Sequence, residues 1–135
     1  MNVLIAQCGG PTAVINASLA AFIAAGQADP RVDQIWGARL GLEGVFLGDW
    51  VDLTDLPSAR LAALSQQPGA ALGAGRYHAD PEAHIALPKT LTAHGVDCLA
   101  LIGGNGTMAA AHAIAAAAQA QRTSLTVVGV PKTID

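Results

Sequence analysis

The sequence predicts an α/β fold in which helices cover both faces of a mainly parallel β-sheet. Short apolar runs without a two-residue period recur along the chain, as expected for strands buried on both faces. Segments with helical spacing of apolar residues alternate with these runs, and such alternation implies right-handed crossovers. With 135 residues, 52% of them hydrophobic, the chain is long enough for one domain with its own core.

The first half of the chain contains two predicted strands and one well-marked helix. The runs NVLIA at 2–6 and QIWGARL at 34–40 predict the strands. Residues 13–26 predict the helix, and Gly26 suits its C-terminal end. The predicted apolar face of this helix consists of Val14, Leu19, Phe22 and Ile23. Closely spaced glycines in residues 41–57 predict turns and short strands rather than a helix.

The second half contains three predicted helices and two predicted strands. Residues 57–67 and 80–95 each place a proline in the first turn of a helix, and Pro88 predicts a kink or a break in the second of them. A glycine-rich loop at 68–78 separates these two helices. The remaining elements are a strand at 96–104, a helix at 105–121 and a strand at 124–131.

Composition excludes several classes of function. Charged residues make up 13% of the chain and the formal net charge is -3, so no basic stripe is available for nucleic acid. The four histidines have no zinc-ligand spacing, and the Ala-rich segment 108–118 is too short to span a membrane. The N-terminus lacks a secretion signal, which predicts a cytoplasmic protein with Cys8 and Cys98 as reduced thiols.

Three loops of the predicted sheet are rich in glycine or polar residues: QCGGPT at 7–12, IGGNGTM at 102–108 and VPKTID at 130–135. All three follow predicted strands, so they open at the carboxyl edge, where open α/β sheets hold their ligands. The first two are predicted to run from strand through Gly-Gly into a helix. Glycines let a ligand approach the backbone, and a helix N-terminus offers N–H groups and partial positive charge. We therefore expect phosphate to bind at this edge.

The polar residues of the second loop leave two interpretations open. Asn105 and Thr107 supply neutral oxygens that suit phosphate, or magnesium through water, while Asn105 also suits a plain helix N-cap. Neither Gly-Gly loop has the spacing of a dinucleotide fingerprint or a P-loop. The expected ligand is therefore a phosphate group, with the rest of the molecule undefined.

Four motifs together resemble the phosphofructokinases. They are QCGGPTAVINASL, LGAGRY, LIGGNGTM and VGVPKTID, and they occur in the order and approximate spacing of the N-terminal half of that family. The resemblance implies a Rossmann-like domain over residues 1–135 that binds the phosphoryl donor, ATP or pyrophosphate, with Mg²⁺ as cofactor. It also implies fructose 6-phosphate as acceptor, a homo-oligomer in the full-length form, and a role in glycolysis without nucleic-acid or membrane partners.

The resemblance assigns roles to residues of each motif. Donor phosphates are expected at Gly9, Gly10, Arg76, Tyr77, Gly104, Asn105, Gly106 and Thr107, with Asn105 also near the metal. The acceptor is expected at Thr133, Ile134 and Asp135, and the catalytic residues are Asp135, Arg76, Thr133 and Lys132. Asp135 would accept the proton of the sugar hydroxyl, and the arginine would stabilise charge on the transferred phosphoryl group.

Two residues give opposite indications about the donor. Gly106 is typical of ATP-dependent members, because pyrophosphate-dependent members usually carry an aspartate there. Lys132 is typical of pyrophosphate-dependent members. Many members also carry an aspartate at the position of Asn105, although one branch with the same GGPTAVINAS loop carries asparagine.

The chain ends at the last residue of the VPKTID motif, before the Asn-Asp pair that usually follows it in the family, so we expect the second, sugar-phosphate-binding domain to be absent and the chain alone to have little activity. Two other functions share some of the features. Another kinase with a G-G-x-G-T loop, of the NAD or lipid kinase type, would share the second motif. A non-catalytic module that binds phosphate or a nucleotide would share the glycine loops.

Overall fold

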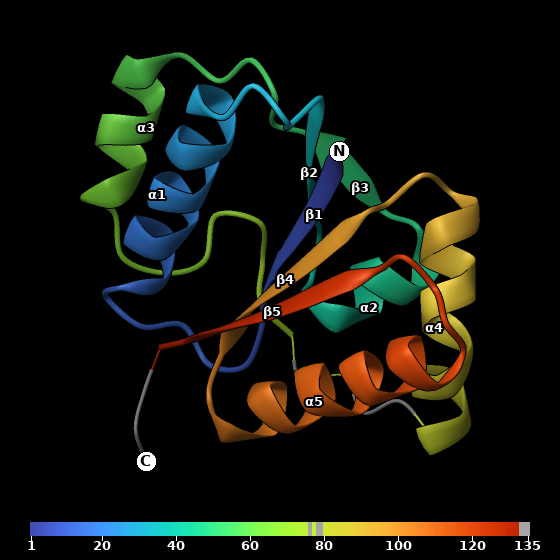
Figure 1. Ribbon diagram of the computed structural model, residues 1–135. Coiled ribbons are helices and arrows are strands. Elements are labelled where there is room, and N and C mark those ends of the chain that lie inside the picture. Colours follow the sequence, from blue (N-terminus) through green and yellow to red (C-terminus); the bar gives the residue numbers. More distant parts are fainter. Residues whose placement is uncertain (76, 78–79, 133–135) are drawn as a thin grey trace.

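The computed structural model describes residues 1–75, 77 and 80–132 of the chain. A five-stranded sheet forms its centre, with the strand order β3-β2-β1-β4-β5 (Figure 1). The strands are β1 (Asn2–Gln7), β2 (Gln34–Ala38), β3 (Trp50–Asp52), β4 (Cys98–Gly103) and β5 (Thr126–Pro131). All neighbouring pairs are parallel except β2 and β3, which confirms the predicted, mainly parallel sheet.

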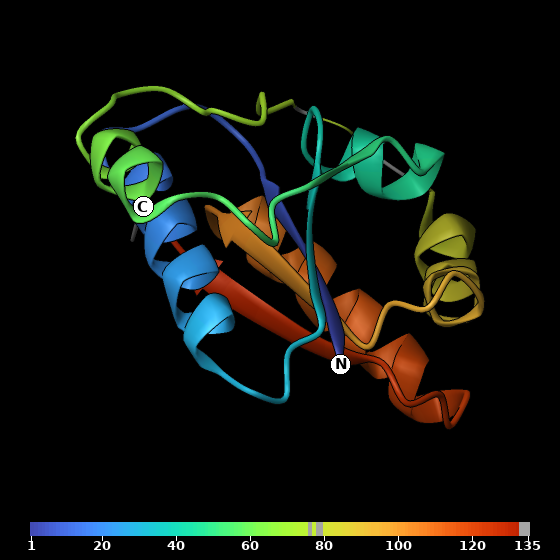
Figure 2. The same cartoon turned by 90° about the horizontal axis from the view of Figure 1, so that it is seen from above.

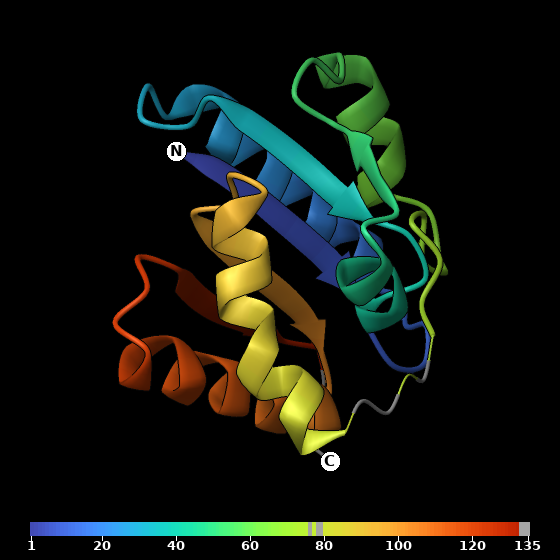
Figure 3. The same cartoon turned by 90° about the vertical axis from the view of Figure 1, so that its right-hand side faces the viewer.

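Helices cover both faces of this sheet, as predicted. They are α1 (Ile15–Ala28), α2 (Leu42–Leu47), α3 (Ser58–Ser65), α4 (Pro81–Ala93) and α5 (Asn105–Ala120). Seen from above, α1 and α3 lie on one side of the strands, and α2, α4 and α5 on the other (Figure 2). Figure 3 looks onto the second of these faces, where α4 crosses in front of the strands.

The two central strands, β1 and β4, supply side chains to two separate cores. Leu4 and Leu101 point to the core shared with α2, α4 and α5. Ile5 and Ile102, their neighbours in sequence, point to the core shared with α1 and α3. All four side chains are fully buried. Burial on both faces explains why these strands are unbroken apolar runs in the sequence.

The prediction that residues 41–57 lack a helix is wrong, because α2 forms at Leu42–Leu47. Gly41 and Gly48 delimit this helix with positive φ angles of 64° and 73°. Gly44 lies inside it, where an added Cβ would be 1.9 Å from the carbonyl oxygen of Arg39. The glycines therefore allow sharp ends and a close backbone contact. The short strand expected in this region is present as β3.

The first helix also differs from its prediction. It begins at Ile15, so Val14 precedes it and is 47% exposed instead of lying on the buried face. It continues past Gly26, where an added Cβ would lie 2.8 Å from Cδ1 of Ile35. Gly26 is thus a packing residue between helix and sheet and does not end the helix. In α4 the helix runs through Pro88 without a break.

Two further predictions concern the state of the cysteines and the length of the apolar helices. Cys8 and Cys98 are both free thiols. Among the described residues, no helix has the length and apolar character needed to cross a bilayer.

Candidate active site

The three predicted loops meet at the carboxyl edge of the sheet because β1, β4 and β5 are parallel neighbours. Backbone hydrogen bonds tie their ends together. The Cys8 N–H donates to the Ile102 carbonyl at 2.8 Å, and the Lys132 N–H donates to the Gly103 carbonyl at 3.0 Å. In Figure 1 the end of β5 lies beside the loop that follows β1. We call this region, formed by residues 8–10, 103–107 and 132, the loop rim.

The first loop of the rim makes a sharp turn directly after β1. Gly9 has a φ of +74°, a conformation that favours glycine, and its N–H donates to the Gly75 carbonyl at 3.3 Å. Cys8 and Gly75 form a parallel bridge at the same place. The predicted order of strand, Gly-Gly loop and helix is present, but α1 begins at Ile15, two residues later than predicted, so the connection to the helix is longer. Its glycines therefore act through the backbone of the loop itself.

The second loop does lead from strand to helix without delay. Gly103 ends β4, Gly104 is the N-cap of α5, and Asn105 is the first helical residue. The interpretation of Asn105 as the N-cap is therefore wrong. Gly104 has no side chain with which to cap this helix, and the first turn contains no acidic residue. The partial positive charge of its N-terminus is thus available to an anion at the rim.

Gly103 and Gly106 of this second loop differ in their surroundings. An added Cβ on Gly103 would lie 2.2 Å from Oγ1 of Thr107, so the buried threonine packs directly over the strand end. Among the described residues, an added Cβ on Gly106 would have no neighbour within 4 Å. Gly103 is required by packing, whereas Gly106 borders open space. A larger side chain at position 106 would therefore project into the region where a ligand could approach.

Lys132 connects the third loop to the first. Its ammonium donates a hydrogen bond to the carbonyl oxygen of Gly10. The same Nζ atom would lie 3.2 Å from a Cβ added to Gly9. The Lys132 ammonium thus lies over the Gly-Gly turn, and the Lys132 backbone is bonded to Gly103, two residues before the start of α5. Positive charge from two sources gathers at the rim.

Cys8 lies at this rim but is a poor nucleophile. Burial raises the pKa of its thiol to about 11, and the Leu42 backbone and the Lys132 charge oppose this only in part. The thiolate is the reactive form of cysteine, so the side chain stays neutral and unreactive at neutral pH. Its role in the rim is packing.

Four predicted site residues lie outside the described residues: Arg76, Thr133, Ile134 and Asp135. Tyr77 is described and is 39% exposed, with its ring packed on Phe46 of α2 at a centroid distance of 5.5 Å. Of the predicted residues, the structure therefore brings together Gly9, Gly10, Gly104, Asn105, Gly106, Thr107 and Lys132.

The described residues offer little to a metal ion by themselves. Within residues 1–75, 77 and 80–132, no group of three or more His, Cys, Asp or Glu side chains could hold one. The rim contributes neutral oxygens from Asn105 and Thr107, and the threonine is buried. Such a donor set fits Mg²⁺ that arrives coordinated by the phosphates of its substrate, as this ion usually does.

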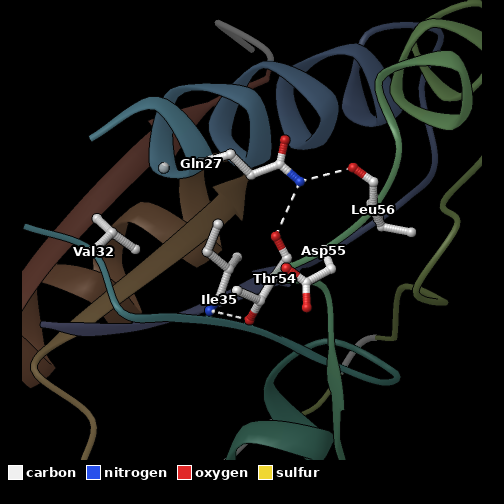
Figure 4. Close-up of a pocket in the computed structure, with 7 residues that line it drawn as sticks. Gln27, Val32, Ile35, Thr54, Asp55 and Leu56 are labelled. Atoms are coloured by element: carbon white, nitrogen blue, oxygen red, sulfur yellow. Dashed lines mark hydrogen bonds between the residues drawn. The ribbon is translucent and has the colours of Figure 1, made fainter. Parts of the chain in front are cut away.

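A separate pocket of about 340 Å³ lies at the opposite, amino end of the sheet (Figure 4). There the Gln27 side chain donates to the carbonyls of Thr54 and Leu56 at 3.1 and 2.8 Å. These bonds fix the connection between β3 and α3. The pocket is remote from the carboxyl edge where ligands bind in sheets of this type.

Two buried amides beside the rim escaped the sequence predictions. Gln7 ends β1 and Asn16 lies in the first turn of α1, and their side chains are 0% and 2% exposed. Each is a polar residue within or directly beside an apolar segment of the sequence, and this pattern could have identified them.

The phosphofructokinase family model matches the chain from residue 2 to residue 135. The chain belongs to the phosphofructokinase family. This match confirms the resemblance that the four motifs indicated, and it favours this family over the NAD and lipid kinases that share only the G-G-x-G-T loop.

Relatives in this family differ in donor and in acceptor. The chain is 36% identical over 135 residues to a sulfofructose kinase of Alkalicoccus urumqiensis. It is 38% identical over 139 residues to a pyrophosphate–fructose 6-phosphate 1-phosphotransferase of Xanthomonas campestris. It is also 32% identical over 131 residues to an ATP-dependent 6-phosphofructokinase of Amycolatopsis methanolica. These matches cover 97–100% of this chain but 28–34% of each relative.

Solved structures of phosphofructokinases share the fold. A pyrophosphate-dependent phosphofructokinase from Nitrosospira multiformis superposes with a TM-score of 0.90 at 29% identity, over 99% of this chain and 34% of that one. The chain therefore spans about a third of the length of the phosphofructokinases it matches.

Proposed function

We propose that residues 1–135 form the phosphoryl-donor-binding domain of a 6-phosphofructokinase. In this proposal a phosphoryl group passes from ATP or pyrophosphate to the 1-hydroxyl of fructose 6-phosphate, as in glycolysis. Membership of the family and the names of its pyrophosphate- and ATP-dependent relatives support this activity. Because the chain covers about a third of those relatives, the acceptor site would be supplied by residues beyond this segment of the family fold.

The observation that carries the proposal is the meeting of three loops at one edge of the sheet. The Lys132 ammonium on the Gly10 carbonyl, the uncapped N-terminus of α5 and the open face of Gly106 surround the same edge of the sheet. A phosphate chain there would accept hydrogen bonds from backbone amides and be neutralised by a cation. In the described structure the Gly9 N–H is bonded to Gly75, so the amides of the second loop are the first candidates for this contact.

The reacting groups of the proposal follow the family motif. Asp135 would accept the proton of the attacking hydroxyl, Arg76 would stabilise charge on the phosphoryl group, and Thr133 and Ile134 would contact the acceptor. Mg²⁺ would bridge donor oxygens and neutralise their charge when it is bound, with Asn105 nearby. The protein's own contribution is positioning and fixed charge, on which phosphoryl transfer mainly depends.

A second candidate acceptor is sulfofructose. The sulfofructose kinase of Alkalicoccus urumqiensis is 36% identical to the whole of this chain, comparable to the pyrophosphate-dependent relatives. Since both kinds of relative share the donor domain, this chain's own residues do not separate a 6-phosphate from a 6-sulfonate. Offering both acceptors in the same assay decides between them.

The test begins with the donor, because the rim lies on this chain. The purified protein is titrated calorimetrically with pyrophosphate and with ATP, each with Mg²⁺. Transfer to each acceptor is then measured in an enzyme that contains this domain within the complete family fold. We expect one donor to bind and to lose affinity in the Lys132→Met variant, by about tenfold for one lost charge-assisted contact. The proposal is wrong if neither donor binds, or if binding is unchanged in this variant.

The Gly106→Asp variant tests where the donor lies. The open space at Gly106 can accept the new carboxylate without a packing clash. That carboxylate would repel the additional phosphate of a nucleotide, so we expect ATP binding to be lost while pyrophosphate binding remains measurable. Retention of ATP binding would contradict the inferred path of the donor.

A further inference from the structure

Two buried side-chain amides connect the core of the domain to the loop rim. Gln7 and Asn16 are 0% and 2% exposed, which would be costly for amides without hydrogen-bond partners. Gln7 Nε2 donates to Asn16 Oδ1 at 2.9 Å and to the Ile15 carbonyl at 3.3 Å. The two amides therefore form a linked pair between the end of β1 and the start of α1.

The outer atoms of this amide pair all bond to one segment of the chain, residues 67–72. Gln7 Oε1 accepts from the Leu72 N–H at 2.9 Å, and Asn16 Oδ1 accepts from the Ala71 N–H at 2.8 Å. Asn16 Nδ2 donates to the carbonyls of Gln67 and Pro68 at 3.1 and 3.4 Å. Both amide nitrogens thus use both of their N–H groups.

Residues 67–72 lead directly into the loop rim. Leu72 is also bonded through its carbonyl to the Leu40 N–H at 3.0 Å, so its position is fixed on two sides. Three residues later, the Gly75 carbonyl accepts from the Gly9 N–H. A chain of three residues cannot absorb a large displacement, so the position of residue 72 constrains the Gly9–Gly75 contact. Residue 76, the arginine of the LGAGRY motif, follows at once.

We propose that Gln7 and Asn16 are positioning residues of the donor site. They fix residues 67–72 against β1 and α1, and through them the Gly9–Gly75 contact at the rim. The inference rests on the proposed function, because it assigns the amide pair to the same donor site. Neither side chain is proposed to contact the donor itself.

The chemistry of the pair explains why both residues are amides. Asn16 must accept from an N–H on one side and donate to two carbonyls on the other, and only an amide presents both sets of atoms. In an Asn16→Asp variant the second carboxylate oxygen would face the carbonyls of Gln67 and Pro68 without a proton to share. The shape and the bond from Ala71 are kept while the two bonds to Gln67 and Pro68 are lost, which makes this the sharpest substitution.

The chain offers two matched controls. Gln27 makes the same kind of clamp, with one amide nitrogen donating to two loop carbonyls, but at the amino end of the sheet (Figure 4). Gln27→Leu therefore removes two bonds of similar geometry, made by an exposed side chain, away from the rim. Ile23→Val removes a buried methyl group from α1, two turns beyond Asn16, and controls for general loss of stability in the same helix.

The experiment measures donor affinity and local hydrogen exchange in the purified protein. Pyrophosphate and Mg-ATP are titrated into the wild type, the single variants Asn16→Asp and Gln7→Leu, the double variant and the two controls. Amide exchange is followed by mass spectrometry for peptides that cover residues 67–75. Asn16→Ser, which keeps one donor to a carbonyl, replaces Asn16→Asp if that variant does not fold.

We expect Asn16→Asp and Gln7→Leu to speed exchange in this segment and to weaken donor binding by about tenfold each, as for loss of buried hydrogen bonds. The double variant should be little worse than either single variant, because the amides act as a unit. Both controls should leave the two measurements unchanged. Faster exchange with unaltered donor affinity, or equal weakening by Gln27→Leu, would overturn the inference. Failure of the wild type to bind either donor would instead refute the proposed function.

Discussion

The two Gly-Gly loops look alike in the sequence but are built differently. After β1 the chain turns sharply at Gly9, with φ +74°, and α1 begins only at Ile15. After β4 the chain passes from Gly103 through one N-cap residue straight into α5. The first loop needs glycine for its backbone conformation. The second needs it for space, because Thr107 packs over Gly103.

This difference implies different roles for the two loops. A helix N-terminus is a fixed source of partial positive charge, so the second loop is suited to hold an anion with little rearrangement. The first loop is held from outside, by Gly75 on one side and by the Lys132 ammonium on the other. Its geometry therefore depends on parts of the chain that are distant in sequence, and perturbing those parts should affect it first.

The largest expected effect is in neither Gly-Gly loop but at the third, where Asp135 is the proposed base. In an enzyme that contains the complete family fold, Asp135→Asn should lower turnover by about 10² or more with little change in donor affinity, because it removes a general base and leaves the anion site intact. Turnover with each donor and calorimetric donor affinity are the measurements. A loss of affinity with normal turnover would mean that Asp135 belongs to the donor site.

The sequence predicted the sheet well because its signals are local. Apolar runs such as 2–6 and 96–104 favour strands buried on both faces, and the structure has strands at Asn2–Gln7 and Cys98–Gly103. Glycine misled the prediction twice, at Gly26 and Gly44, since it marks close approach inside a helix as well as helix ends. The presence of a glycine in the sequence does not by itself distinguish close packing inside a helix from the end of a helix.

The sequence predicted the loops of the rim but not the hydrogen bonds that join them. The glycine loops and Lys132 were identified from motifs, yet the bond from Lys132 to Gly10 joins residues 122 positions apart. The Gln7–Leu72 bond spans 65 positions. Such pairs depend on how strands are arranged in space, which spacing along the chain does not determine.

The next largest effect should come from Gly103→Ala in the second loop. The new Cβ would lie 2.2 Å from Oγ1 and 2.5 Å from Cβ of Thr107, so the first turn of α5 must move. Overpacking of this kind typically costs about 1–3 kcal/mol of unfolding free energy. Urea denaturation measures it, and donor affinity should fall in parallel as the helix N-terminus shifts. Unchanged stability would show that the close contact of Thr107 is not a constraint.

A smaller effect is expected for Gly9→Ala in the first loop, with Gly48→Ala as a matched control. Both glycines have nearly the same φ, +74° and +73°, so alanine should cost each about 1 kcal/mol in backbone strain. Gly48 has no neighbour within 4 Å, whereas Lys132 Nζ would lie 3.2 Å from the new Cβ at Gly9. Equal losses of stability, with donor affinity lowered only in Gly9→Ala, would assign the difference to Lys132. Donor affinity that falls equally in both variants would remove Lys132 from the explanation.

The smallest effect should be that of Gly106→Ala, which completes the comparison within the second loop. Gly106 lies in the first turn of α5, and its added Cβ would meet open space. Alanine favours a helix over glycine by up to about 1 kcal/mol in the interior and by less at an end, so stability should stay equal or rise slightly. A methyl group carries no charge, and Gly106→Ala should therefore keep the ATP affinity that Gly106→Asp loses. Urea denaturation and ATP titration of Gly103→Ala, Gly106→Ala and Gly106→Asp side by side would separate packing from charge at this loop. If Gly106→Ala destabilised the protein as much as Gly103→Ala, the structural requirement for glycine would be the same at both positions.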